Sequence, residues 1–416
     1  MLTVDEAQAR ILATVVPMGI ESVPLAEAYG RFLAADLTAS VDLPPWDNSA
    51  MDGYAVRAAD TTDGEVVLTL LGTVGAGSVA AGRVEPGAAI GIMTGAPVPA
   101  GADAVVIVED TDGSRAGSVR MRGRARPGQH VRRRGEDVRS GSVVLLAGAK
   151  LTPAAVGLAS SLGRTSLDVR RRPIVAVLST GDEVVPPGMA LQPGQIWSSN
   201  NASLVGQILE AGGVPLDLGN TPDRLEDTIA ALARAVEAAD VVVTTGGVSV
   251  GAFDVVKEAH AAVGATAEFW KVRMKPGKPL AFGRIENGGR SVPLFGLPGN
   301  PVSCMVNFAQ FVRPWLRTAL GDARPFLPVV EAIAGETFDE APGRARLIRV
   351  RLSRDGDRIV AFSTGSQSSG VLTSMVRAHG LLLVGADAPP PRGGDPVRVQ
   401  ILDPSFLDGE SAAYGW

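Results

Sequence analysis

The sequence predicts a multidomain protein that combines α/β and β domains, and three observations lead to this prediction. The chain has 416 residues, more than one ordinary hydrophobic core accommodates. From residue 173 to residue 325, strand-like apolar runs alternate with helical ones, which is typical of a mostly parallel sheet covered by helices. On both sides of this stretch, short β-branched runs are separated by glycine and proline, which indicates smaller β domains.

Four domains are expected from these changes along the chain. A mixed helical linker domain is discontinuous and consists of residues 1–45 and 141–172. A small β domain takes residues 46–140 between its two parts, and the central α/β domain follows with residues 173–325. Residues 326–416 are expected to form a C-terminal β domain with a barrel-like arrangement.

The amino-terminal segment predicts a helix near residues 4–16. Thr3 and Glu6 have the spacing of a capping box, in which the two residues exchange side-chain and backbone hydrogen bonds. A second helical stretch is expected at LAEAYGRFLA, residues 25–34. Beyond it, the runs EVVLTLLGTVGAG and ADAVVIVED have the β-strand character of the second domain.

The elements of the α/β domain follow from its apolar runs. Strands are expected at IVAVL, VPLDL, VVVTT and SVPLFGL, with helices between them. The helix after Asp223 is the best specified, because apolar side chains recur at intervals of four, three and four residues from Leu225 to Val236. Asp223 and Glu226 repeat the capping-box spacing. In the last domain, LIRVRLSRDGDRIVAFS predicts a hairpin, and APPPRGGDP predicts a break before a final strand.

Composition excludes several classes of protein. Hydrophobic residues make up 45% and charged residues 20% of the chain, which is ordinary for a soluble folded protein. The net charge of -5 argues against a protein that coats nucleic acid, since neutralising phosphates needs a basic face. The amino terminus is acidic and amphipathic rather than signal-like, and no apolar run reaches membrane-spanning length. We therefore expect a soluble cytoplasmic protein with no membrane partner.

Nitrogen and sulfur ligands for metals are scarce. Cys304 is the single cysteine of the sequence, which excludes an internal disulfide and cysteine-based zinc or iron–sulfur frameworks. The three histidines lie far apart, with no HExxH-like spacing. A hard cation held by carboxylates is favoured over a histidine-bound transition metal.

The stretch ADVVVTTGGVSVGAFD ends a strand in a glycine-rich turn. The chain leaves the strand through Gly246, Gly247, Ser249 and Gly251, where bare backbone amides can approach an anion at the carboxyl edge of a parallel sheet. The spacing matches neither GxGxxG nor a Walker A loop. The alternative is a tight turn with no ligand, in which Asp254 only stabilises the start of the next helix.

A second strand ends in STGDEVV. It places Ser179, Thr180, Gly181, Asp182 and Glu183 at what should be the same edge. Adjacent carboxylates beside hydroxyl groups suit a magnesium ion that also contacts a substrate phosphate. A turn or helix-start cluster without a ligand is the alternative.

Asp223 follows a third strand, and helix capping is its alternative role. Three carboxylate-bearing loops that follow successive parallel strands would lie together at one edge of the sheet. Turns with a purely structural role have no reason to carry carboxylates at the same edge, so this arrangement favours a binding site.

Two further stretches are suited to anions. KVRMKPGKPLAFG holds Lys271, Lys275 and Lys278 in a loop stiffened by proline, which suits an anion. The alternative is an ordinary charged turn, which would have the same residue pattern. GLPGNPVS offers Asn300 as a candidate N-cap and Pro301 as the first helical residue, so free amides would face outward there.

The small β domain has its own dense polar stretch. PPWDNSAMDGYAV places Asp52 among short polar residues, and IMTGAPVPAGAD offers Thr94 in a turn. Local turns that satisfy the backbone are the alternative. Residues 115–139 contain nine arginines, most of which are expected on a solvated β surface.

Together these motifs resemble those of one family. PPWDNSAMDGYAV, IMTGAPVPAGADAVV, GEDV, LSTGDEVV, VVVTTGGVSVGAFDVV, MKPGKPLAFG and GLPGNPVS occur in this order and look like the successive motifs of the molybdopterin molybdenumtransferases, a family that also includes the gephyrin E domain. The resemblance covers nearly the whole chain. It implies that the central domain is of the molybdopterin-binding type.

The resemblance also implies an activity. The family inserts molybdenum from molybdate into adenylylated molybdopterin, with Mg²⁺-dependent release of AMP. It implies a homodimer whose active site is shared between subunits, with the first β domain of one subunit closing the site of the other. It allows contact with a molybdopterin adenylyltransferase and with proteins that mature molybdoenzymes, and it involves no nucleic acid.

The family's functional residues carry over onto matching positions of this sequence. The catalytic set implied by the resemblance is Asp52, Thr94, Asp137, Glu183, Asp223, Asp254, Lys271, Lys275 and Lys278. The set expected to bind the substrate is Ser179, Thr180, Gly181, Gly246, Gly247, Ser249, Gly251, Pro298, Asn300, Pro301 and Ser368. The residues expected to hold magnesium are Asp182, Glu183 and Asp254. Ser368 lies in GSQSS, which departs from the family's GSQGS-like loop.

Two other functions compete with this one. The central domain alone would also fit a molybdopterin adenylyltransferase or a related nucleotide-modifying enzyme, against which the WDNSAMDG-bearing first domain argues. A non-catalytic scaffold of the same fold is the second alternative, which the intact carboxylates and lysines disfavour.

Overall fold

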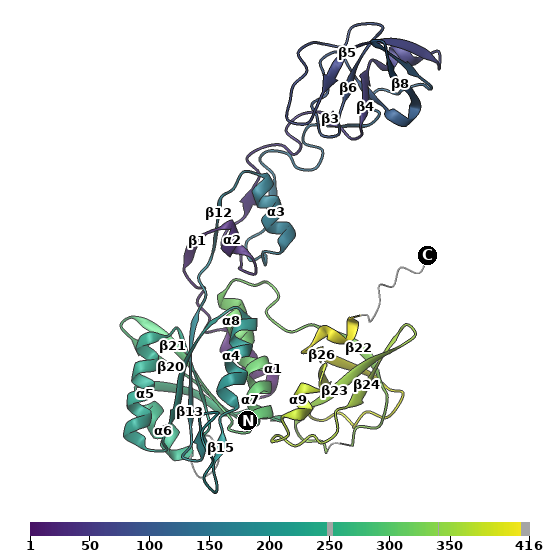
Figure 1. Cartoon of the computed structure of the whole chain (residues 1–416). Coiled ribbons are helices and arrows are strands. Elements are labelled where there is room, and N and C mark those ends of the chain that lie inside the picture. The colour runs from purple at the N-terminus through teal and green to yellow at the C-terminus, as the bar shows by residue number, and fades with distance from the viewer. Residues whose placement is uncertain (248–252, 340, 409–416) are drawn as a thin grey trace.

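The computed structural model describes residues 1–247, 253–339 and 341–408, and it describes no side chain of residues 253–257. The molecule is elongated (Figure 1). The α/β domain and the C-terminal β domain lie side by side at one end, the linker lies in the middle, and the first β domain forms the far end. The predicted multidomain arrangement of α/β and β domains is confirmed.

A mostly parallel sheet of six strands, in the order β16-β13-β17-β21-β20-β18, forms the centre of the α/β domain. The first four strands of this order pair in parallel, and the last two pair antiparallel. The antiparallel pair was not predicted. The strands are β13 (Ile174–Thr180), β16 (Val214–Thr221), β17 (Val241–Thr245), β18 (Ala265–Lys271), β20 (Pro279–Asn287) and β21 (Arg290–Leu297).

Helices cover both faces of this sheet (Figure 1). On one face α5 packs beside α6, and Leu232 and Val236 join the buried sides of β13 and β17 in one apolar cluster. On the other face α4 packs with α7, which continues through a π-helical turn into α8. The helices are α4 (Asn200–Ala211), α5 (Leu225–Ala238), α6 (Phe253–Ala262), α7 (Pro301–Asn307) and α8 (Arg313–Ala319).

The first helix, α1 (Val4–Leu12), begins with the predicted capping box between Thr3 and Glu6. It ends at Leu12, four residues before residue 16, with Ala13 as its C-cap. Its buried residues Ala7 and Ile11 belong to the core cluster of the α/β domain, although we expected residues 1–45 in the linker.

The linker is small and has its own apolar cluster. The second predicted helical stretch, residues 25–34, is helical only over α2 (Leu25–Ala28), and Gly30 then takes a φ of 75° that ends any helix. The other elements are β1 (Ile20–Pro24), β2 (Leu37–Thr38), β11 (Val143–Leu145), α3 (Pro153–Ser161) and β12 (Ser166–Arg170).

The first β domain contains a second six-stranded sheet, in the order β7-β4-β6-β5-β9-β8. Its strands are β4 (Gly53–Val56), β5 (Val66–Val74), β6 (Ala88–Ile92), β7 (Ala104–Ile107), β8 (Thr111–Arg115) and β9 (Ser118–Met121). Beside it, β3 (Asn48–Ser49) pairs with β10 (Val131–Arg132).

The C-terminal domain is a closed barrel, as the sequence predicted in outline. Its strands follow the order β23-β24-β22-β26-β25, and β25 pairs back onto β23. The predicted hairpin is β23 and β24, which turn between Asp355 and Arg358. The elements are β22 (Val329–Ala334), β23 (Ala345–Asp355), β24 (Arg358–Ser363), α9 (Thr373–Val376), β25 (Gly380–Val384) and β26 (Pro396–Ile401).

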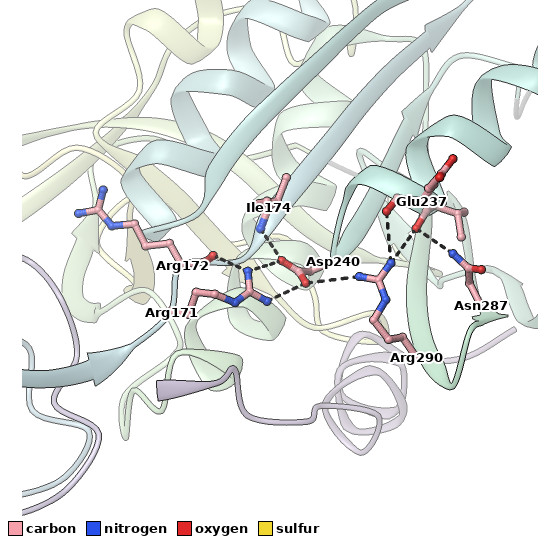
Figure 2. Close-up of polar contacts among 8 residues, drawn as sticks. Arg171, Arg172, Ile174, Glu237, Asp240, Asn287 and Arg290 are labelled. Atoms are coloured by element: carbon pink, nitrogen blue, oxygen red, sulfur yellow. Dashed lines mark hydrogen bonds and ion pairs between the residues drawn. The ribbon is translucent and has the colours of Figure 1, made fainter. Parts of the chain in front are cut away.

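Where the linker enters the α/β domain, Asp240 anchors the chain (Figure 2). Its carboxylate accepts hydrogen bonds from both terminal nitrogens of Arg171, at 2.9 and 2.8 Å, and from the amide of Ile174 at 2.8 Å. Arg290 adds an ion pair at 4.0 Å. Burial alone would raise the pKa of Asp240, but these hydrogen bonds outweigh it and hold the pKa below its usual value.

Candidate functional site

A cavity of about 690 Å³ lies at the carboxyl edge of the parallel strands. Residues that follow β13, β17 and β21 form its wall, together with the first residues of α4 and α7. This is the edge at which ligands bind in open α/β sheets. Of the residues predicted for the site, the wall contains Ser179, Thr180, Gly181, Glu183, Asp223, Gly246, Gly247, Pro298, Asn300 and Pro301.

The glycine turn after β17 forms one side of the cavity. Gly246 has a φ of 94°, and a Cβ atom built there would lie 2.4 Å from the carbonyl oxygen of Thr180. A side chain at this position therefore meets both backbone strain and a steric clash. The predicted members Ser249 and Gly251 of the same turn lie outside the described residues.

Asn200, which the sequence analysis did not single out, ties three loops of the wall together. Its Nδ2 donates to Oγ1 of Thr245 and to the carbonyl oxygen of Gly299, both at 2.8 Å. Oγ1 of Thr245 donates to the carbonyl oxygen of Pro298 at 3.1 Å. The ends of β17 and β21 and the start of α4 are thus joined, which fixes the geometry of the wall. An asparagine at a helix start was the only sequence signal.

Several polar atoms of the wall are buried without a partner. Oγ1 of Thr180, Oγ of Ser198 and Oδ1 of Asn200 have no hydrogen-bond partner among the described residues. Buried polar groups are nearly always paired in folded proteins. All three residues line the cavity, so a bound polar molecule would satisfy them.

Two helices begin at the cavity without a side-chain cap. α4 has Ser199 as its N-cap and α7 has Asn300, and neither side chain makes a capping hydrogen bond. Asn300 and Pro301 occupy the predicted N-cap and first helical positions. The amides and the dipole at the start of α4 favour an anion. The start of α7 does not offer the free amides that were expected there, because Pro301 has no N–H and the amide of Val302 donates to the carbonyl oxygen of Ser369.

The carboxylates of the second and third loops lie close together. The amide of Asp223 donates to Oδ1 of Asp182 at 3.1 Å. Burial, and then the charges of Asp182 and Glu183, raise the pKa of the Asp223 carboxyl. The predicted capping role of Asp223 is wrong: Arg224 is the N-cap of α5, its side chain makes no cap, and Asp223 instead forms part of the cavity wall.

A complete protein-only metal site is not formed within the described residues, since they contain no group of three or more His, Cys, Asp or Glu side chains placed to hold an ion. Asp254, the third predicted magnesium ligand, lies in the first turn of α6, and its side chain is outside the described part. Mg²⁺ commonly uses only one or two protein carboxylates, with substrate phosphates and water as the other ligands. Burial and the charges of Asp182 and Glu183 raise the pKa of Asp223, and a cation bound through one or two of these carboxylates would offset the repulsion between them.

The three predicted lysines are separated by the structure. Lys271 ends β18 and lines a different, shallow pocket beside Leu2 and Arg10. Lys275 lies in β19 (Met274–Lys275), which pairs with β23 of the barrel. It lines a narrow pocket with two buried arginines, Arg346 and Arg349. The exposed Lys278 lines neither of these pockets.

The loop that carries Ser368 connects this narrow pocket with the main cavity. Arg349, which is 1% exposed, donates to the carbonyl oxygens of Ser366 at 3.2 Å and Ser368 at 3.0 Å. The amide of Val302 in α7 donates to the carbonyl oxygen of Ser369 at 3.1 Å. The sequence predicts only that Arg349 belongs to a hairpin, because its burial under a distant loop has no local signal.

The remaining predicted residues lie far from the cavity in the same chain. Asp52 accepts hydrogen bonds from the amide of Thr94 at 2.6 Å and from its hydroxyl at 2.8 Å, which lower the pKa of Asp52. Both belong to the first β domain, at the opposite end of the molecule from the cavity (Figure 1). Asp137 is exposed where the first β domain meets the linker, and its amide donates to the carbonyl oxygen of Leu43.

Comparison with known proteins covers every domain. The family model of the MoeA N-terminal region (domain I and II) matches residues 2–163, that of a probable molybdopterin binding domain matches 176–318, and that of the MoeA C-terminal region (domain IV) matches 331–402. Molybdopterin molybdenumtransferase 2 of Mycobacterium tuberculosis is 40% identical over 387 residues, covering 91% of this chain and 94% of that protein. The chain belongs to the molybdopterin molybdenumtransferase family.

Other members of the family agree with this assignment. The molybdopterin molybdenumtransferase of Bacillus subtilis is 34% identical over 408 residues, covering 96% of this chain and 94% of that protein. The crystal structure of the molybdopterin biosynthesis MoeA protein from Pyrococcus horikoshii matches with a TM-score of 0.82 at 29% identity, covering 96% of this chain and all (100%) of that one. Over the described residues, no helix is long and apolar enough to cross a membrane.

Proposed function

We propose that this chain transfers molybdenum from molybdate to adenylylated molybdopterin and releases AMP. The observation that carries the proposal is the cavity at the carboxyl edge of the central sheet, where clustered carboxylates lie beside two uncapped helix starts. The names of the relatives, molybdopterin molybdenumtransferases over more than nine-tenths of the chain (91% and 96%), support the same reaction.

Both reactants are anions, so their approach must be made favourable by the protein. The amides at the start of α4 provide the positive end of a fixed dipole, and the lack of side chains at Gly246 and Gly247 lets a phosphate approach the backbone closely. Such fixed groups require no reorganisation when the reactants meet. In this proposal they hold the phosphates of adenylylated molybdopterin in the main cavity.

In this proposal the molybdate binds nearer the C-terminal domain than the phosphates do. Lys275 and Lys278 neutralise oxyanion charge, and Arg349 holds the loop that brings Ser368 toward α7. Molybdenum takes its sulfur ligands from the cofactor, in agreement with the single cysteine, Cys304, which is fully buried.

Magnesium is expected as the cation that neutralises the phosphoanhydride. In this proposal one or two of the carboxylates of Asp182, Glu183 and Asp223 would hold it, with substrate phosphates and water as the other ligands, and Asp254 is the further candidate. When bound, Mg²⁺ would supply charge neutralisation at the phosphate oxygens.

A second copy of the chain is expected to complete the site. Asp52 and Thr94 belong to the first β domain, which lies at the opposite end of the molecule from the α/β domain (Figure 1), and Asp137 lies where that domain meets the linker. We therefore propose a homodimer in which the first β domain of each subunit closes the cavity of the other. Contact with an adenylyltransferase that supplies the substrate fits this scheme.

The test is AMP release from adenylylated molybdopterin in the presence of Mg²⁺, measured with and without molybdate. Release that depends on molybdate supports the proposal. Net adenylylation would support the adenylyltransferase alternative, and binding without turnover would support a scaffold. Loss of release after chelation of Mg²⁺ is expected.

A further inference from the structure

A surface segment at the mouth of the main cavity exposes several large apolar side chains. It begins with β14 (Val184–Val185) and ends with β15 (Ile196–Trp197). The exposed fractions are 56% for Met189, 41% for Leu191, 56% for Ile196 and 52% for Trp197. The half-exposed indole ring of Trp197 is therefore available as a contact surface for a bound molecule.

The segment is held firmly to the wall of the cavity. Strands β14 and β15 pair in parallel, and the amides of Ile196 and Ser198 each donate at 2.8 Å, to the carbonyl oxygens of Glu183 and Val185 respectively. Asn220 donates to the carbonyl oxygens of Gly181 at 2.9 Å and Val184 at 3.0 Å. These bonds fix the segment relative to the carboxylate loop.

The indole of Trp197 is oriented by its own hydrogen bond. Nε1 donates to the carbonyl oxygen of Met189 at 2.8 Å. This satisfies the one polar group of the side chain, so the ring surface that remains available is apolar and flat. Trp197 and Ile196 both line the cavity, whereas Met189 and Leu191 do not.

A site for an anion lies next to this ring. Trp197 precedes Asn200, the first residue of α4, by three positions, and the residues between them also line the cavity. Thr180 on the same wall is 4% exposed, and its hydroxyl has no partner among the described residues. A flat apolar surface beside unsatisfied polar groups and free helix amides fits a planar heteroaromatic ring joined to a phosphate.

We propose that Trp197 is the stacking surface for a fused-ring system of the substrate, either its adenine or its pterin, while the attached phosphate lies at the start of α4. This proposal rests on the proposed function, because that function supplies a substrate in which both rings are linked to phosphate. Trp197 is therefore a specificity-determining residue that contacts the ring system of the substrate and not its phosphate.

The experiment measures binding of three probes to the full chain by calorimetry: AMP, a pterin carrying a phosphate, and ribose 5-phosphate. Trp197→Ala is expected to lower the affinity for one ring-bearing probe by about tenfold, within the range known for base–aromatic stacking. Binding of ribose 5-phosphate stays unchanged. The ring-bearing probe whose affinity falls contains the ring that stacks on Trp197. Trp197→Phe keeps a flat ring and should recover most of the lost affinity.

Leu191→Ala is the matched control, because it removes an exposed apolar side chain of the same segment that does not line the cavity. It should leave all three affinities unchanged. The proposal is overturned if Trp197→Ala leaves the affinities for both ring-bearing probes unchanged, or if it lowers the affinity for ribose 5-phosphate by the same factor. It is equally overturned if the unaltered protein binds neither ring-bearing probe. It is also overturned if both variants change only self-association, which would make the segment a docking surface.

The two proposals fail separately. If AMP release does not depend on molybdate but the affinity for a ring-bearing probe depends on Trp197, the stacking site is supported and the proposed function is contradicted. If AMP release depends on molybdate but the affinity for the ring-bearing probes does not depend on Trp197, the proposed function is supported and the stacking site is contradicted.

Discussion

The backbone amide of Asp223 donates a 3.1 Å hydrogen bond to Oδ1 of Asp182, which holds two acidic loops of the central sheet together. Glu183 adds a third negative charge, and the pKa of the Asp223 carboxyl rises as a result of burial and of these neighbours. Such a concentration of charge costs stability unless a cation neutralises it.

Asp223→Asn should therefore stabilise the folded protein at neutral pH in the absence of divalent cations. A carboxyl group whose pKa is higher in the folded chain favours folding only below its unfolded pKa, near 3.8, and loses that contribution as the pH rises through the folded value. The variant's free energy of unfolding relative to the parent should rise between acidic and neutral buffer. Urea titrations at both pH values measure it, and a pH-independent difference would contradict the interpretation.

Mg²⁺ should stabilise the parent protein more than Glu183→Gln. Binding to the folded state alone raises the free energy of unfolding by about 2.7 kcal/mol at a concentration of 100 times the dissociation constant. Glu183 lines the cavity beside Asp223, so removing its charge should abolish most of this gain. Thermal unfolding with increasing Mg²⁺ checks it. Equal gains in both proteins would show that the cation binds elsewhere.

Gly246→Ala should lower stability by at least about 1–2 kcal/mol and strongly reduce activity, because it combines left-handed backbone strain with a 2.4 Å approach to the carbonyl oxygen of Thr180. Gly188→Ala separates the two effects. Gly188 has a similar φ of 92° but nothing within 4 Å of a built Cβ atom. Denaturant unfolding of both variants should show the larger loss for Gly246→Ala, and equal losses would mean that the clash is relieved.

Asp240→Asn should lower the free energy of unfolding at neutral pH by about 1–3 kcal/mol, because it removes a charged acceptor from a partly buried pair with Arg171 (Figure 2). The pKa of Asp240 is depressed in the folded chain, so this contribution is present above the ordinary Asp pKa and is lost as the pH falls through the folded value. The difference between variant and parent should shrink in acid.

Asp387→Asn is its control, since the side chain of Asp387 is 79% exposed in its ion pair with Arg273. Exposed pairs contribute little, so an effect near zero is expected. Similar losses in both variants would remove the special role assigned to the Arg171–Asp240 pair.

Mixing two inactive variants should restore activity if subunits share their sites. Asp52→Asn and Glu183→Gln alter opposite ends of the molecule (Figure 1). Random reassociation in a two-fold dimer leaves one intact site in half of the dimers, which predicts about a quarter of the parent activity. A mixture of Asp52→Asn with Thr94→Val should stay inactive, because both changes affect the same half-site. No recovery in the first mixture would exclude sharing.

Features confined to a few neighbouring residues could be predicted from the sequence. The capping box of Thr3 and Glu6 and the positions of Asn300 and Pro301 depend on the local chain alone, and both predictions are confirmed. The parallel strands were predictable because a strand buried on both faces needs an unbroken apolar run. Their order implied that the loops after them meet at one edge, where the cavity lies.

The tertiary structure alone decided which of the polar residues meet. Asp223 had the spacing of a helix cap, but packing of its loop against Asp182 placed it in the cavity wall. Lys271 and Lys275 are four positions apart in the sequence, yet they line different pockets, because β18 and β19 join different sheets. Arg349 holds a loop nearly twenty residues away, and Trp197 lines the cavity through a segment no pattern marked. Periodicity and capping act over one or two turns of chain, whereas these contacts depend on how whole domains pack.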